Sequence, residues 1–363
     1  MRKRILTAAV MAAIAGASIA AHADESTTVG GKAYIDFTNK TVKSSGATTD
    51  KSTGFDLKRF YLSVGHNFDD MWSANLTTDV NYAADCGTYI TGVDFGTSTT
   101  SSSTCKPTDV NLYVKKAYLQ AKFSDAAKLR LGSADMPWIP YVENAYGYRY
   151  VEKTLIDLTG FGTSADWGAH LGGKVGMVNY AVSAVNGNGY KHPDRSKSLD
   201  FAGRVGVMPI EGLNLAVGFY DGKLGNNTYA NSNNPSLTIN TAKRTDVLAA
   251  YSHNMFNVGA EFFSAKDWKN LSSTSSKASG YSAFGSVKAG NGIAVFARYD
   301  QSKPAKNTTD NPKQTYYHVG VSYEARKNVD LALAYKNTKV THNTTGAGDD
   351  KATEVGIWTQ VKF

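Results

Sequence analysis

Two local patterns in this sequence have residue types and a spacing that could do chemistry. Residues 168–175 read GAHLGGKV, which has the spacing of a phosphate-binding loop but lacks its final Ser or Thr. His192 and Ser196 are a base and a nucleophile close in sequence, yet no acid or amide is evident that would orient the histidine. The histidines beyond residue 23 show no metal-ligand spacing and are His66, His170, His192, His253, His318 and His342. We therefore expect no catalytic site, no cofactor and no metal.

A second group of candidate residues lies in one segment, residues 133–163. A connection of this length is usually either functional or disordered. Its many aromatic and aliphatic side chains favour burial, which argues against disorder. The candidates for a site in this segment are Asp135, Glu143, Tyr146, Tyr148, Arg149, Glu152, Lys153 and Asp157. What they do depends on the elements that position them.

The first residues of the chain indicate export. The basic start MRKR is followed by an apolar run over residues 5–21 and by Ala21-His22-Ala23. A cationic head, an apolar middle and a small-residue cleavage site form a secretory signal peptide. A membrane anchor is the alternative, but the run is short and acidic Asp24 follows the site at once. We expect cleavage after Ala23 and a single domain over residues 24–363.

The two cysteines, Cys86 and Cys105, both lie in a segment rich in Ser, Thr and Gly. An exported chain meets an oxidising compartment, so we expect a disulfide between them. Two thiolates with no nearby histidine would supply only half of a zinc site.

Composition alone points away from a membrane protein. The mean hydropathy is −0.33, and no segment after the signal peptide approaches the eighteen or so apolar residues of a transmembrane helix. The net charge of +8 is small and scattered, and three of the basic residues belong to the signal peptide. Nucleic acid is therefore not expected as a partner.

Side-chain polarity alternates with a period of two along most of the chain. In residues 60–68, for example, Phe60, Leu62 and Val64 alternate with Tyr61 and Ser63. Successive residues of a strand point to opposite faces, so each such segment has one apolar and one polar face. Helical spacing is nowhere comparably strong. Sixteen strands are predicted, at 29–38, 57–68, 72–82, 110–123, 127–133, 164–174, 178–186, 199–208, 213–222, 244–253, 257–265, 279–288, 293–300, 315–324, 329–337 and 353–363.

The connections between these strands alternate between short and long. Turns of a few residues follow 68, 123, 174, 208, 253, 288 and 324, whereas longer loops follow 38, 82, 133, 186, 222, 265, 300 and 337. A β-sandwich needs no such rhythm, but a transmembrane β-barrel has short turns at one rim and long loops at the other. Aromatic residues near both strand ends, such as Trp72 and Tyr299, match the girdles at the two bilayer interfaces. We expect an all-β, sixteen-stranded antiparallel transmembrane barrel.

The last strand reads EVGIWTQVKF and ends the chain on Phe363. A terminal aromatic residue on an alternating strand resembles the assembly signal of Gram-negative outer-membrane proteins, and the chain after residue 23 resembles the sixteen-stranded porins. Residues 128–138, KLRLGSADMPW, are similar to the phosphate-selective porin O/P family at the start of its long third loop. That family's basic anion-binding residues have no clear counterpart in the loop of this chain.

The porin resemblance implies passive diffusion of small hydrophilic solutes and ions through a water-filled pore. It also implies a homotrimer in the bacterial outer membrane, in contact with lipid and lipopolysaccharide. The segment 133–163 would be the third loop, folded inward so that its charged residues narrow the pore. An outward loop packed against a neighbouring barrel is the alternative.

The polar phase of the strands supplies the charges of the lumen. Basic and acidic candidates balance, so we expect at most a weak anion preference. A guanidinium stays charged and binds oxyanions well. The arginines expected to form a basic wall opposite the third loop are Arg59, Arg130, Arg204 and Arg298.

Other functions stay open at this stage. A plugged structural or adhesive barrel would bind through the polar loops at 83–109 and 223–243, and a barrel hydrolase would use His192. A channel that guides sugars along the tyrosines of the third loop is a further alternative. Single-channel conductance distinguishes the diffusion channel from the plugged barrel.

Overall fold

The structure is a computed structural model of the chain that describes residues 25–82, 110–226, 239–268, 275–304, 311–344 and 348–363. The expected signal peptide, the pair Cys86 and Cys105, and most of the polar loops at 83–109 and 223–243 lie outside these residues. Within the described part, no helix is long and apolar enough to cross a membrane.

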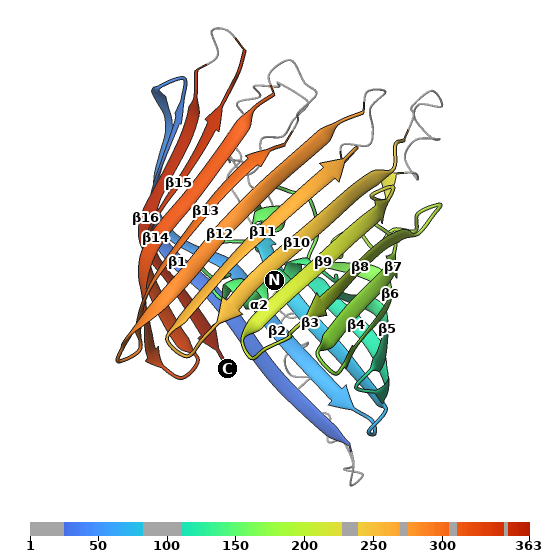
Figure 1. Ribbon diagram of the computed structural model, residues 1–363. Helices are drawn as coiled ribbons and strands as arrows, with labels where there is room; N and C mark the ends of the chain where they lie inside the picture. Colours follow the sequence, from blue (N-terminus) through green and yellow to red (C-terminus); the bar gives the residue numbers. More distant parts are fainter. Residues whose placement is uncertain (1–24, 83–109, 227–238, 269–274, 305–310, 345–347) are drawn as a thin grey trace, which may run out of the picture.

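Sixteen strands form one closed antiparallel barrel, with strand order β1-β16-β15 and so on back to β2 (Figure 1). The strands are β1 (Ser26–Ser44), β2 (Ala47–Asn67), β3 (Trp72–Tyr82), β4 (Val110–Ser124), β5 (Ala127–Asp135), β6 (Ala165–Val175), β7 (Val178–Val185), β8 (Asp200–Val207), β9 (Leu213–Gly222), β10 (Ala242–Ser252), β11 (Phe256–Lys266), β12 (Lys277–Gly290), β13 (Ile293–Lys303), β14 (Lys313–Arg326), β15 (Val329–Thr341) and β16 (Asp350–Lys362). All sixteen predicted strands and the predicted fold class are confirmed.

The alternation seen in the sequence becomes the two faces of the barrel wall. Along β10, for instance, Asp246, Leu248 and Ala250 are buried toward the interior, whereas Val247 is 43% exposed on the outside. Exposed Val, Leu, Phe and Tyr side chains occupy the outward phase of many strands. Such an apolar outer face suits hydrocarbon, and a closed ladder leaves no strand edge unpaired in it.

Strand β1 pairs with both β2 and β16, and this closes the barrel. The carboxyl terminus takes part, because the backbone of Phe363 exchanges hydrogen bonds of 2.8 and 3.1 Å with Gly31. The Phe363 ring lies over Gly31 and near Phe60, with a centroid distance of 6.4 Å between the two rings. The residue expected to be an assembly signal therefore lies at the closing seam.

One predicted connection is wrong. The sequence suggested a long loop after residue 38, but β1 and β2 continue to Ser44 and Ala47 and are joined through Ser45 and Gly46. Both connecting residues have positive φ, 49° and 85°, as tight hairpin turns require. Residues 39–56 are mostly polar, and polarity alone favours a loop, yet a hairpin that extends past the apolar band can have two polar faces.

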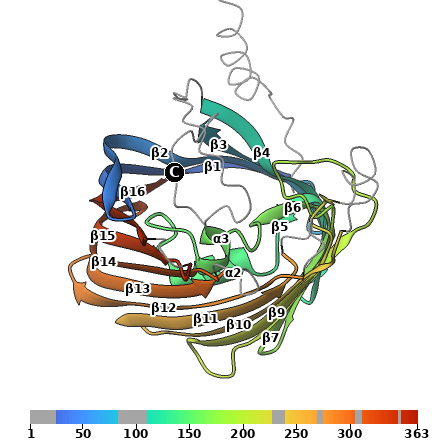
Figure 2. The same cartoon turned by 90° about the horizontal axis from the view of Figure 1, so that it is seen from above.

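Two short helices, which the sequence reading missed, lie between β5 and β6. They are α2 (Ile139–Tyr146) and α3 (Leu155–Leu158), and seen from above they lie inside the ring of strands (Figure 2). At four to eight residues they are too short to give a clear 3.6-residue period.

Gly132 in β5 offers a test of the strand geometry that leads into these helices. Its φ is +125°, and an added Cβ would lie 2.1 Å from the Ala117 carbonyl oxygen. We expect Gly132→Ala to lower the free energy of unfolding by about 1–3 kcal/mol or more, measured as the urea midpoint in detergent. Gly54→Ala is the control, because nothing lies within 4 Å of its Cβ position. Equal losses in the two variants would contradict this account.

Candidate functional site

The connection between β5 and β6, residues 136–164, is named loop 3 here, and it lies within the barrel (Figure 2). Its apolar side chains pack on the inner surface of one half of the wall. Buried loop residues Trp138, Ile139, Val142, Leu155 and Ile156 form one cluster with wall residues that include Leu248, Phe263 and Phe284. Burial of this apolar surface holds the loop inside the lumen.

Small wall residues make room for the loop. Four alanines of β9 to β12 lie in the same cluster, at 216, 250, 265 and 278. At Gly218 an added Cβ would lie 2.5 Å from the Trp138 ring. The wall beneath the loop is therefore shaped to fit it.

Polar contacts fix the loop as well. The Trp138 indole N–H donates to the Glu261 carboxylate at 2.7 Å, and the Tyr146 hydroxyl lies 3.2 Å from Nε2 of His318. The Lys336 ammonium pairs with Glu152 at 3.2 Å. These anchors come from β11, β14 and β15, so the loop is attached across several strands.

Arg204 and Arg298 also hold loop 3. Nε of Arg204 donates to the Pro137 carbonyl at 2.9 Å, and its guanidinium lies 3.5 Å from the centre of the Tyr141 ring. Arg298 pairs with Asp300 and donates to the Lys153 carbonyl at 2.5 Å. Two of the four arginines expected opposite the loop thus bind the loop itself, because the polar phase also faces the lumen on the strands that it covers.

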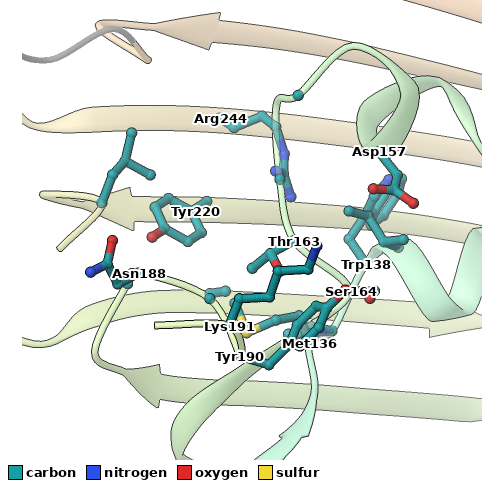
Figure 3. Close-up of a pocket in the computed structure, with 18 of the residues that line it drawn as sticks. Met136, Trp138, Asp157, Thr163, Ser164, Asn188, Tyr190, Lys191, Tyr220 and Arg244 are labelled. Carbon is teal, nitrogen blue, oxygen red and sulfur yellow. The ribbon is translucent and has the colours of Figure 1, made fainter. Parts of the chain in front are cut away.

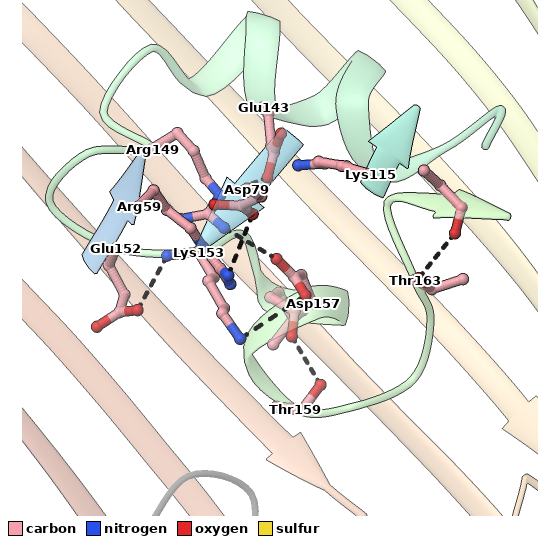
Figure 4. Close-up of polar contacts among 12 residues, drawn as sticks. Arg59, Asp79, Lys115, Glu143, Arg149, Glu152, Lys153, Asp157, Thr159 and Thr163 are labelled. Atoms are coloured by element: carbon pink, nitrogen blue, oxygen red, sulfur yellow. Dashed lines mark hydrogen bonds and ion pairs between the residues drawn. The ribbon is translucent and has the colours of Figure 1, made fainter. Parts of the chain in front are cut away.

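Four charged side chains of loop 3 bind one another (Figure 4). They are Glu143, Arg149, Lys153 and Asp157, and they are named the free edge of the loop here. Arg149 lies 2.5 Å from Glu143 and 3.4 Å from Asp157, and the Lys153 ammonium lies 4.0 Å from Asp157. A network of ion pairs restricts these side chains to one arrangement, so the edge of the loop presents fixed charges.

Charges on the facing wall come from β2, β3 and β4. Arg59 pairs with Asp79 at 3.3 Å, and both contact the Tyr113 hydroxyl. The Lys115 ammonium donates to the neutral Tyr61 hydroxyl at 3.2 Å and lies 4.5 Å from the centre of its ring. The wall therefore presents a lysine whose described partner carries no charge.

The electrostatics of Asp157 link loop and wall. Burial by itself would raise the pKa of the Asp157 carboxyl. Four cations lower this pKa by a larger amount, so the net shift is downward. They are Lys153 and Arg149 of the loop and Arg59 and Lys115 of the wall. Asp157 therefore stays ionised between these cations.

A cavity of about 370 Å³ is lined by loop 3, by residues 187–192 and by strands β8 to β10 (Figure 3), and Arg59 and Lys115 of the facing wall line it as well. Among the residues that the structure describes, its lining includes six Lys and Arg side chains and one carboxylate, Asp157. The basic residues are Arg59, Lys115, Arg149, Lys153, Lys191 and Arg244. Trp138, Tyr190, Tyr220 and Trp268 line it as well. A small hydrophilic solute that passes here meets mostly positive charge.

The expected constriction residues are thus only partly together. Arg149, Lys153 and Asp157 line the cavity, and Glu143 is bound to Arg149. Asp135 pairs with Lys116 at 2.6 Å at the end of β5, and Arg130 donates to Gln120.

Tyr146 and Tyr148 face the wall. The Tyr146 ring packs against Phe284 at 5.4 Å between ring centres, and the Tyr148 ring stacks on Phe296 at 4.2 Å. Tyr146 is buried and Tyr148 is half-buried with one ring face stacked, an arrangement that does not favour the alternative of a sugar-guiding surface.

Sequence reasoning missed two basic residues that strand alternation hides. In β4 the register shifts so that Thr77 pairs with Lys116 and Thr78 with Val114, which leaves Lys115 as an extra residue. In β2 a similar shift leaves Lys58 extra, and it pairs with Asp36 at 3.4 Å. Each β-bulge turns two successive residues to one side. Arg244 was also missed, although its phase matches the buried Asp246.

The motifs that suggested chemistry have structural positions of their own. Residues 168–175 lie within strand β6 and do not precede a helix. Ser196 donates to the Ser198 carbonyl, whereas His192 lines the cavity.

A sixteen-stranded barrel with an apolar outer face, a charged lumen and a loop folded inside defines an outer-membrane diffusion channel. The family described as Gram-negative porin matches residues 7–357. The chain belongs to this family, and it is an outer-membrane channel for passive diffusion. No curated protein matches the sequence.

Solved structures share the fold at low sequence identity. The outer membrane channel DcaP of Acinetobacter baumannii is 12% identical with a TM-score of 0.62, and the match covers 95% of this chain and 99% of that one. The anion-selective porin from Comamonas acidovorans is 13% identical with a TM-score of 0.60, over 94% and 100% of the two chains. The trimer form of OmpT from Vibrio cholerae is 14% identical with a TM-score of 0.56, over 94% and 100%.

The ion pair between Lys336 and Glu152 gives a test of loop 3. Burial alone would raise the pKa of Glu152, but Lys336 and the backbone N–H of Lys153 lower it from its usual 4.5 to about 2. Because the folded pKa is depressed, the contribution of this pair is complete above the unfolded value and is lost only as the pH falls through about 2. We expect removal of this ion pair to have the same effect on the open-channel current at neutral pH and at about pH 5.

Glu152→Gln should loosen the loop at neutral pH, because the Lys336 ammonium then loses a charged partner. The frequency of partial closures in single-channel records is expected to rise several-fold. Glu211→Gln, in the exposed turn between β8 and β9, is the matched control. If Glu152→Gln shows no more partial closures than wild type, this ion pair does not hold the loop.

Proposed function

We propose that this porin conducts small hydrophilic solutes and ions with a weak preference for anions, selected at the cavity that loop 3 lines together with residues 187–192 and the barrel wall. The observation that supports this proposal most is the lining of the cavity, with six cations and one carboxylate among the described residues. Fixed charge acts strongly in a narrow channel with low-dielectric walls.

The preference is weak because most of the arginines are paired. Arg59 lies against Asp79, Arg149 against Glu143 and Asp157, and Arg244 against Asp246. Much of the excess positive charge comes from two lysines. Lys115 is bound to the Tyr61 hydroxyl, and Lys153 lies 4.0 Å from Asp157, a carboxylate that it shares with Arg149.

Reversal potentials across a planar bilayer in a salt gradient test this proposal. Replacement of Lys115 and Lys153 by Gln should lower the permeability ratio of chloride to potassium by about twofold or more. Lys303→Gln, on the outer face of β13, should leave the ratio unchanged. A wild-type channel that prefers cations would overturn the proposal. A protein without conductance steps would instead favour the plugged barrel.

We further infer that the chain forms a homotrimer whose outer surface contacts lipopolysaccharide. The similarity to the trimer form of OmpT supports the first part. Exposed apolar side chains around the wall, such as Phe219 and Val217, are suited to contact lipid or a second barrel. Light scattering of the detergent-extracted protein should give three times the mass of the chain, and a monomer mass would contradict the trimer.

A further inference from the structure

A row of lysines encircles more than half of the barrel near the loop ends of the strands. Nine consecutive strands, from β10 through β16 to β1 and β2, each contribute one of them. The row, named the lysine belt here, consists of Lys243, Lys266, Lys277, Lys303, Lys313, Lys339, Lys351, Lys43 and Lys51. All are exposed except Lys313, which is half-buried.

Every lysine of the belt points outward. On eight of the nine strands it lies four residues from an aromatic or aliphatic side chain of the outer face, as Lys266 does from Phe262 and Lys303 from Tyr299. An even spacing along a strand places both residues on one side of the sheet. On β1 the spacing from Phe37 to Lys43 is also even.

The belt lies at the level expected for lipid headgroups. Four residues of strand span about 13 Å, which corresponds to roughly 10 Å along the membrane normal at the usual strand tilt. The aromatic side chains below the belt pair across strands, with ring centroids 6.3 Å apart for Tyr281 and Tyr299. Aromatic girdles mark the bilayer interface, so the ammonium groups lie just outside it.

The arrangement is unfavourable without an anion. Four cross-strand pairs place lysine directly opposite lysine: Lys243 with Lys266, Lys266 with Lys277, Lys339 with Lys351, and Lys351 with Lys43. Like charges at directly opposite positions destabilise a sheet. In the described part of the chain, ion pairs are formed by Lys243 with Asp221 at 3.2 Å and by Lys339 with Asp349 at 2.5 Å.

The other rim of the same strands differs. Near the short turns the outward phase ends in apolar or aromatic side chains, as with Phe256 on β11, Val287 on β12, Ile293 on β13 and Tyr323 on β14. The outward-facing row of lysines therefore lies at the rim with the long loops, which faces the cell exterior in an outer-membrane barrel, whereas a lysine at the other rim such as Lys288 follows the outward-facing Val287 and lies in the opposite phase.

We propose that the lysine belt binds the phosphate groups of lipid A, the anionic anchor of lipopolysaccharide in the outer leaflet. Ammonium groups bind phosphate as compact point charges, while the acyl chains lie against the aromatic and aliphatic band below. This inference rests on the proposed contact with lipopolysaccharide and names its site on the wall. It does not depend on the selectivity of the pore, since the belt faces away from the lumen.

Binding of purified lipid A to the detergent-solubilised full-length protein, measured by native mass spectrometry, tests the proposal. The variant replaces Lys266, Lys277, Lys339 and Lys351 by Gln. Basic residues near an anionic lipid surface each contribute about fivefold to binding, so the loss should exceed tenfold. The control replaces lysines of the short-turn rim by Gln at Lys122, Lys128, Lys288 and Lys327.

Two further arms identify the chemistry. Dephosphorylated lipid A should bind wild type and variant equally and weakly, and inorganic phosphate should not compete at equal concentration. Equal lipid A binding by wild type and belt variant would overturn the proposal, as would an equal loss in the control. Unchanged single-channel conductance of the belt variant shows that the barrel is intact, so failure here is distinct from failure of the channel function.

Thermal unfolding in a neutral detergent gives an independent measurement. Because the lysines repel one another, the belt variant should unfold at the same or a higher temperature than wild type. Added lipid A should raise the unfolding temperature of wild type by more than that of the variant. The proposal would be contradicted if the variant were less stable than wild type in neutral detergent and lipid A raised both unfolding temperatures equally.

Discussion

Hydrocarbon offers no partner to a backbone N–H or C=O, and the closed ladder between β1 and β16 meets this constraint. Once the sheet is closed, its residues are divided between an outside that contacts lipid and an inside that contacts water and loop 3. The polarity of each strand follows from that division. So does the placement of loop 3, whose apolar residues lie inside the barrel against wall residues such as Leu248 and Phe284.

Loop 3 is held inside the barrel by apolar packing on the wall and by hydrogen bonds and ion pairs. The buried side of the loop contacts alanines and a glycine of the wall, Arg204 and Glu261 bind its first residues, and Lys336 binds Glu152 farther along. The free edge carries Arg149 and Asp157 in a network with their neighbours. A loop built this way holds its charges at fixed positions, as the proposed anion preference requires.

The sequence predicted the strands well because alternation is a local property. Each of the sixteen segments contains enough apolar and polar positions to show a period of two, and neighbouring strands do not alter it. The short helices of loop 3 could not be seen in this way. The extended hairpin of β1 and β2 was missed for a different reason, since Asn39 and Thr53 pair beyond the apolar band, where polarity no longer identifies a strand.

The site was predictable only in part, because it depends on contacts between distant segments. One face of loop 3 packs on the wall and the other does not. Tyr146 is buried because it lies on the first face, whereas Arg149 lines the cavity. Lys115 and Lys58 reach the lumen through register shifts that no local pattern announces.

The two bulges show how pore charge can change in evolution at little cost to the membrane fold. One inserted codon in β4 or β2 adds a lumen-facing residue. The outward residue next to the bulge, Val114 in β4 or Leu57 in β2, stays in phase with its neighbours. Substitution would have to exchange a residue that already contributes to the lumen, whereas insertion adds one. Length variation within strands is therefore a route by which related barrels can acquire different ion preferences.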